Sequence, residues 1–266
     1  MSFSIKGRTA IVTGAAAGVG LAIARHFTEA GARVVMADMD EKRLKAAVED
    51  IDGEVQVFTC DLREKLSVAN LLSTTVDAFD RVDILVNASR QVHPSDPLDP
   101  EKDCMETMLR QNLMTALRMS QACARRMIAQ AEEEGREDGV AGSIVNLSSI
   151  AARRTQPDLL AYSVSCAALD QMTRGMAVAL APDRIRVNAV AFGSVMSDSL
   201  RDSIKEHSEF RDDIRDHTPL HRIAAPRELA EAVQFLASDG AGFVTGEILT
   251  VDGGRSLIDA VSAPAH

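Results

Sequence analysis

Short runs of apolar, largely β-branched residues alternate along the whole chain with longer stretches of helical periodicity. The runs that predict strands lie at 8–13, 33–38, 54–61, 82–87, 142–148, 184–191 and 247–254. Between them, helices are predicted at 18–30, 40–51, 64–80, 101–131, 161–180 and 226–237. Continuous apolar runs are typical of strands buried on both faces, and strands that alternate with helices form right-handed βαβ units. The alternation therefore predicts an α/β fold: a parallel, doubly wound sheet flanked by helices.

The composition bounds the class of protein. A length of 266 residues and a hydrophobic content of 46% fit one large globular domain. We expect no membrane span and no signal peptide, because no apolar run reaches about 18 residues and the first residues lead directly into a strand. The net charge of −10 and a pI of 5.1 argue against a nucleic-acid partner. Four cysteines without a C-x-x-C pair, and histidines without ligand spacing, predict a reduced, cytoplasmic protein without a metal site.

A glycine-rich turn follows the first predicted strand and opens the first predicted helix. The stretch TGAAAGVG places Gly14, Gly18 and Gly20 where a pyrophosphate would meet the helix N-terminus. Asp38 ends the second strand, where a carboxylate can accept hydrogen bonds from ribose hydroxyls and repel a 2′-phosphate, so the pattern favours NAD over NADP. Alternatively, Asp38 only caps the next helix. Asp61 ends the third strand, where it could contact the adenine.

Several motifs in a fixed order carry a resemblance that covers essentially the whole chain. They are GRTAIVTGAAAGVG, VDILVNAS, RQNL, GSIVNLSS, a tyrosine 13 residues after Ser149, RIRVNAVAFG, TPLHRIAAPRELAEAVQFLAS and FVTGEILTVDGG. With these motifs the chain resembles the short-chain dehydrogenase/reductase family. The resemblance implies a single Rossmann-type domain of seven parallel strands, a homotetramer or homodimer, and hydride transfer between a nicotinamide and a carbinol or carbonyl carbon.

The resemblance also implies roles for individual residues. Ser149 would polarise the substrate oxygen, Tyr162 would be the general acid/base, and Asn112 would hold a water in the proton relay. Asn87 and Ala88 would flank the cofactor, and Val195 and Ser197 would face its carboxamide. The residues predicted to bind NAD are Gly14, Gly18, Val19, Gly20, Asp38, Asp61, Leu62, Asn87, Ala88, Val195 and Ser197.

Three residues depart from the family pattern near the predicted nicotinamide site. Ser89 stands where the family has glycine, Phe192 where it has proline, and Cys166 where it has the catalytic lysine. Positions 162 and 166 share a helix face, so a lysine there would favour the ionised phenol. A pKa near ~10 must fall toward ~7 for a useful base, and cysteine supplies no charge for that shift.

Other residues could compensate for the missing lysine. Arg90, Arg153 and Arg154 could reach inward, although we interpret them as solvated surface residues. Cys166 could act as a nucleophile, although the small residues around it favour an inert, buried thiol.

The prediction is an NAD(H)-dependent oxidoreductase that interconverts a secondary alcohol and a ketone, with slow turnover and a basic optimum for oxidation. The alternative is a catalytically inactive NAD-binding module that kept the scaffold. Residues 194–222 are polar and helix-biased, and they follow the sixth strand where a substrate lid would lie. The helix after Tyr162 is rich in small residues, which suits packing between subunits or within one core. The substrate and the reaction direction stay open.

Overall fold

Seven parallel strands form one sheet in the computed structural model, which describes residues 3–259. Their order is β3-β2-β1-β4-β5-β6-β7, so the chain winds outward in both directions from the middle of the sheet. The strands are β1 (Thr9–Thr13), β2 (Arg33–Asp38), β3 (Val55–Thr59), β4 (Ile84–Asn87), β5 (Gly142–Ser149), β6 (Ile185–Phe192) and β7 (Ile248–Val251). The predicted fold class, a Rossmann-type α/β domain, is confirmed.

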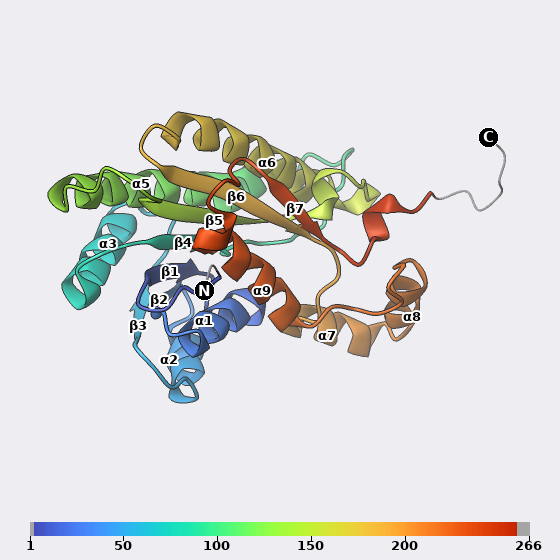
Figure 1. Cartoon of the computed structure of the whole chain (residues 1–266). Helices are drawn as coiled ribbons and strands as arrows, with labels where there is room; N and C mark the ends of the chain where they lie inside the picture. Colours follow the sequence, from blue (N-terminus) through green and yellow to red (C-terminus); the bar gives the residue numbers. More distant parts are fainter. Residues whose placement is uncertain (1–2, 260–266) are drawn as a thin grey trace.

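Helices cover both faces of the sheet (Figure 1). One face packs against α1 (Gly18–Glu29), α2 (Glu41–Glu49) and α9 (Pro226–Ala237), and the other against α3 (Lys65–Phe79), α5 (Thr115–Glu133) and α6 (Leu160–Leu180). β1, β4, β5 and β6 are buried at every position, which explains why their sequences read as continuous apolar runs. The two apolar cores lie between the sheet and these layers.

The helix predicted at 101–131 differs from the structure in two ways. It begins only at Met105, because Cys104 has a φ of 42° and interrupts the helical path. A π-helical turn, η1 (Leu109–Met114), then separates α4 (Met105–Met108) from α5. Such turns shift the register of a helix and are frequent at functional sites. Hydrophobic periodicity could not reveal this turn, because it changes the period for only a few residues.

The segment predicted to be a lid folds into two short helices, α7 (Asp198–Glu206) and α8 (Glu209–Asp216). They lie between β6 and α9 in sequence and extend beyond the main body of the sheet (Figure 1). The role of this segment as a lid stays a prediction. Within residues 3–259, none of the helices has the length and hydropathy that crossing a bilayer requires.

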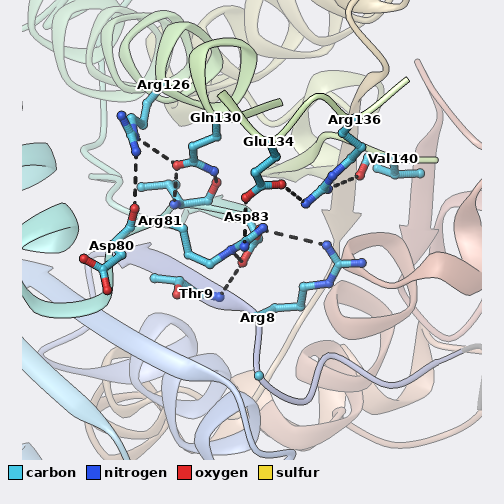
Figure 2. A network of polar contacts seen from close by, with 12 residues as sticks. Arg8, Thr9, Asp80, Arg81, Asp83, Arg126, Gln130, Glu134, Arg136 and Val140 are labelled. Atoms are coloured by element: carbon cyan, nitrogen blue, oxygen red, sulfur yellow. Dashed lines mark hydrogen bonds and ion pairs between the residues drawn. The ribbon is translucent and has the colours of Figure 1, made fainter. Parts of the chain in front are cut away.

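A network of charged groups closes the amino edge of the sheet (Figure 2). The Asp83 carboxylate, whose side chain is 1% exposed, accepts three hydrogen bonds from the Arg81 guanidinium at 2.7–3.0 Å and one from the Thr9 amide at 2.9 Å. Gln130 of α5 brackets the Val82 peptide, accepting from its nitrogen at 2.7 Å and donating to its oxygen at 2.9 Å. This edge is therefore held together by hydrogen bonds among charged and amide groups.

Candidate active site

A cavity of about 660 Å³ lies at the opposite, carboxyl edge, between β1, β2 and β4. Its wall contains the glycine-rich turn, the end of β2 and the segment after β4. The lining residues are Gly14, Ala16, Ala17, Gly18, Val19, Gly20, Asp38, Met39, Arg43, Cys60, Asp61, Leu62, Ala88, Ser89, Arg90, Gln91, Gln111, Leu147, Ser197 and Asp202. Nine of the eleven residues predicted to bind NAD are in this wall, all but Asn87 and Val195.

The glycines of the turn are required by close backbone contacts. A Cβ on Gly20 would lie 2.1 Å from the Gly14 carbonyl oxygen, and one on Gly14 would lie 2.7 Å from the Ser89 Cα. Gly14 and Gly18 also have φ values of +65° and +58°, a region that other residues rarely adopt. The turn consequently lies directly against the start of α1 and the segment after β4. Its shape matches the glycine-lined helix N-terminus that cradles a pyrophosphate.

Asp38 supports this turn from the end of β2. One carboxylate oxygen accepts a hydrogen bond from the Ala16 amide and the other accepts one from the Asp40 amide, both at 3.0 Å. The cap of α2 is Asp40, which accepts from the Arg43 amide, so the alternative role of Asp38 as the helix cap is wrong. Arg43 also lines the cavity, a cation in the same wall as Asp38 that the sequence analysis did not consider.

The other predicted cofactor residues take different positions. Asp61 lines the cavity but pairs with Arg63 at 2.6 Å, and this guanidinium lowers the pKa of the carboxyl group. Asn87 is buried under the cavity and donates to the Asn146 oxygen at 2.8 Å. Val195 is buried and bridges to Ala224. Leu62, Ala88 and Ser197 lie in the cavity wall.

A second cavity, of about 630 Å³, contains Ser149 and Tyr162 in its wall. Ser149 ends β5 and Tyr162 lies in the first turn of α6, so the two predicted catalytic residues are brought together from different elements. Apolar, polar and charged residues complete the wall: Ile150, Ala151, Arg154, Thr155, Gln156, Leu159, Phe192, Gly193, Ser194, His217, Arg255, Ile258 and Asp259. A substrate in this cavity could place its oxygen between the serine and tyrosine hydroxyls.

Tyr162 is buried, with 4% of its surface exposed. Burial raises the pKa of its phenol, and the charge of Arg90 and a hydrogen bond with Ser149 oppose that rise. Nη1 of Arg90 donates a hydrogen bond to the tyrosine oxygen at 2.5 Å, and its Cζ lies 4.3 Å from the centre of the Phe192 ring. The phenol therefore has a cationic neighbour.

The inward position of Arg90 corrects our interpretation of this residue as solvated surface. The sequence shows a lone arginine just after a strand, a position at which long charged side chains usually face water. In the structure the aromatic face of Phe192 and the Tyr162 hydroxyl give the guanidinium two partners inside the site. Among the described residues, the hydrogen bond from an arginine to the phenol comes from Arg90 and not from Arg153 or Arg154; Arg154 donates to the Ser256 carbonyl.

Comparisons with known proteins decide the family. A family model described as Enoyl-(Acyl carrier protein) reductase matches residues 14–256. The 7alpha-hydroxysteroid dehydrogenase of Escherichia coli K12 is 32% identical over 253 residues, 94% of each chain. The chain belongs to the short-chain dehydrogenase/reductase family.

Two further similarities cover nearly the whole of this short-chain dehydrogenase/reductase. The cis-4-hydroxycyclohexanecarboxylate dehydrogenase of Sinomonas cyclohexanicum is 34% identical over 253 residues, 94% of this chain and 97% of the relative. A solved structure of a 7alpha-hydroxysteroid dehydrogenase complexed with NADH and 7-oxo glycochenodeoxycholic acid has a TM-score of 0.87, with 32% identity and coverage of 95% and 96%. The relatives thus include dehydrogenases of cyclic alcohols.

Cys166 lies one helical turn after Tyr162, at the position where the family resemblance implies lysine. It is buried, 4% exposed, and desolvation raises the pKa of its thiol, while contacts with Tyr162 and Arg90 oppose that rise. A protonated, buried thiol is a poor nucleophile. This agrees with the interpretation of Cys166 as an inert packing residue.

Asn112 lies in η1, and its amide is fully engaged by protein groups. The side-chain oxygen accepts from the Gln91 amide at 2.8 Å, and the nitrogen donates to the Gln91 carbonyl at 2.9 Å and to the Ser165 hydroxyl at 3.1 Å. Asn112 therefore fastens the segment that carries Arg90 to α6. Its predicted role as the holder of a relay water stays a prediction. Among the described residues, no cluster of histidine, cysteine and acidic side chains could hold a metal ion.

Proposed function

We propose that this protein is an NAD(H)-dependent oxidoreductase that interconverts a secondary alcohol and a ketone. The observation that carries the proposal is the position of Ser149 and Tyr162 in the wall of one cavity, beside a second cavity lined by the glycine turn and Asp38. Arg90 belongs to the wall of the glycine-turn cavity and hydrogen-bonds to Tyr162 in the wall of the other cavity, so the two cavities meet at the phenol. A nicotinamide at this junction would exchange hydride with the substrate carbon.

The residues of the chain account for the remaining chemistry. Gly14, Gly18 and Gly20 present backbone amides to the pyrophosphate, and Asp38 accepts hydrogen bonds from the adenosine ribose. Ser149 holds the substrate oxygen and Tyr162 takes the hydroxyl proton during oxidation or returns it during reduction. Because burial holds the pKa of Tyr162 above its usual value, oxidation is expected to be fastest at basic pH.

The substrate class is open between cyclic and acyclic alcohols. The relatives favour a cyclic secondary alcohol, since two of them are named for hydroxysteroid and hydroxycyclohexanecarboxylate substrates. The lid segment 194–222 contributes His217 to the substrate cavity and Ser197 to the cofactor cavity, which supports its closing over both. We further propose a homotetramer or homodimer, because α6 exposes Leu160, Val164 and Val178 by 40%, 38% and 78%. A cytoplasmic location is proposed because the four cysteines are free thiols.

Steady-state assays test this function. The purified protein is incubated with NAD⁺ or NADP⁺ and a panel of hydroxysteroids, cyclohexanols and linear secondary alcohols, and formation of the reduced nicotinamide is followed by absorbance. We expect turnover with NAD⁺ on at least one alcohol, faster at basic pH. Tight NAD binding by calorimetry without turnover on any alcohol or ketone would favour the second candidate function, an inactive NAD-binding module. The motivation for this candidate is that Cys166 stands where the family resemblance implies the catalytic lysine.

A further inference from the structure

We propose that Arg90 supplies the positive charge on which proton transfer by Tyr162 depends, in place of the lysine that the family resemblance implies at position 166. The proposal rests on the proposed function, and it assigns the residue that makes that function possible. Its starting observation is the hydrogen bond of 2.5 Å from Nη1 of Arg90 to the Tyr162 oxygen. A guanidinium at this distance stabilises a phenolate by charge and by hydrogen bonding together.

The backbone on both sides of Arg90 is fixed. The amides of Ala88 and Ser89 donate to the Thr13 hydroxyl at 3.0 and 3.1 Å, and the Gln91 peptide is held on both sides by Asn112. The guanidinium thus projects from a short segment anchored to β1 on one side and to η1 on the other. This anchoring distinguishes Arg90 from a surface arginine that happens to point inward.

The surroundings of the guanidinium leave its charge available to the phenol. Among the ion pairs of residues 3–259, none engages Arg90, in contrast with Arg81, which precedes β4 and pairs with Asp83. Its other partner is the face of Phe192, 4.3 Å from Cζ, which holds a cation without neutralising it. The charge is therefore not cancelled by a carboxylate.

Two departures from the family pattern form one arrangement around Arg90. Phe192 replaces the proline of the family and provides the aromatic face on which the guanidinium lies. Cys166 is small and uncharged, so position 166 supplies no second cation to the phenol oxygen. We infer that the cation has moved from α6 to the segment after β4, and that positions 166 and 192 fit the new location.

The groups that face Tyr162 define what can titrate there. Arg90 approaches from the segment after β4, Ser149 from β5, and Cys166 from α6, with Asp170 one turn farther along. The cavity wall adds the charged or titratable groups Arg154, His217, Arg255 and Asp259. Of these, Arg90 is the cation that hydrogen-bonds to the phenol oxygen.

The proton transfer balances with Arg90 as a permanent cation. In oxidation the alcohol O–H bond breaks, its proton joins the Tyr162 phenolate, and the hydride with its two electrons leaves the carbon for the nicotinamide. Arg90 keeps all its protons, because a guanidinium does not deprotonate in this range. It acts by stabilising the phenolate before the transfer, and the proton then leaves the phenol to solvent.

The chain offers a direct measurement of this effect. Tyr162 is the only tyrosine and there is no tryptophan, so tyrosinate absorbance in the ultraviolet titrates this one phenol. The variants are Arg90→Met, Arg90→Lys, Cys166→Lys and the double variant Arg90→Met/Cys166→Lys. Thermal unfolding and calorimetric NAD binding establish that each variant is folded.

We expect Arg90→Met to raise the titration midpoint of Tyr162 by at least about one pH unit, and Coulomb's law at ~4 Å with an effective dielectric of ~20 gives about three. Because the phenolate is the active base, the ascending limb of the oxidation rate moves to higher pH by the same amount. At neutral pH this means a loss of about tenfold or more. Arg90→Lys is expected to keep the Tyr162 midpoint and the oxidation rate close to those of the unaltered protein. Adding Cys166→Lys to Arg90→Met should return both quantities toward those of the unaltered protein. Cys166→Lys alone should give no gain in rate.

Two results would overturn the proposal. One is an unchanged Tyr162 midpoint in folded Arg90→Met. The other is faster turnover or tighter NAD binding in that variant, which would mean that Arg90 obstructs the cofactor cavity. If no alcohol is oxidised even by the unaltered protein, the proposed function fails, whereas the absorbance titration still decides the role of Arg90.

Discussion

Arg81 and Arg90 stand at opposite ends of β4 and serve different purposes. At the amino edge, Arg81 makes three hydrogen bonds of 2.7–3.0 Å to the buried Asp83 carboxylate, which also accepts from the Thr9 amide. At the carboxyl edge, Arg90 hydrogen-bonds to a neutral phenol and lies over an aromatic ring. A cation paired with a carboxylate stabilises the fold, whereas a cation left with a phenol is available to stabilise a charge that forms during reaction.

The largest effect is expected when the phenol itself is removed. Tyr162→Phe takes away the proton carrier but keeps the ring, so we expect turnover to fall by about 10³-fold with NAD binding unchanged, since positioned acid–base groups contribute about 10²–10⁴. Stopped-flow and steady-state rates, with calorimetry for NAD, measure this. If Tyr162→Phe keeps more than a tenth of the activity, Tyr162 is not the proton carrier. The proposed catalytic role of the carboxyl edge would then be wrong.

The two arginines can be separated by the same substitution at each end of the strand. Arg81→Met leaves the buried Asp83 carboxylate without its main partner, so we expect the free energy of unfolding to fall by about 2 kcal/mol. This loss is smaller than for a fully buried pair because the Arg81 side chain is 27% exposed. Arg90→Met is its matched control and should leave the urea midpoint within error. If Arg90→Met destabilises the fold as much as Arg81→Met does, the claim that Arg81 serves stability and Arg90 serves the reaction is wrong.

The adenosine end of the carboxyl edge should respond to charge in a different way. Asp38→Asn removes the negative charge while keeping the side-chain shape, and Arg43 in the same wall can then attract a 2′-phosphate. We expect the preference for NAD over NADP, as a ratio of kcat/KM, to fall by about tenfold, equivalent to about 1.4 kcal/mol. Asp202→Asn, in the same cavity wall, is the control and should leave the ratio unchanged. An unaltered ratio in Asp38→Asn would mean that this carboxylate only braces the glycine turn.

The smallest effect is expected at Cys166. Its thiol is buried and desolvation keeps it protonated, so Cys166→Ser should change turnover by less than about threefold, and alkylating reagents should inactivate the folded enzyme only slowly. Initial rates before and after treatment with iodoacetamide measure this. A loss of activity greater than a hundredfold in Cys166→Ser would restore the thiol as a participant in the reaction.

The sequence by itself determined the features that depend on local pattern. The alternation of apolar runs with helical stretches predicted the seven strands and the main helices, and the spacing of Gly14, Gly18 and Gly20 between the first strand and the first helix predicted the glycine turn. The pairing of Ser149 with Tyr162 followed from spacing and family resemblance. These features are encoded in segments of a few residues, so one sequence suffices to find them.

Tertiary structure alone decided where the cation of the site comes from. The direction of Arg90 depends on Thr13, Asn112, Tyr162 and Phe192, which come from four segments far apart in the sequence. The π-helical turn that places Asn112 is likewise invisible to a periodicity of 3.6 residues. A long, flexible charged side chain takes the direction that its partners stabilise. Because those partners are far away in the sequence, the residues next to Arg90 do not predict its direction.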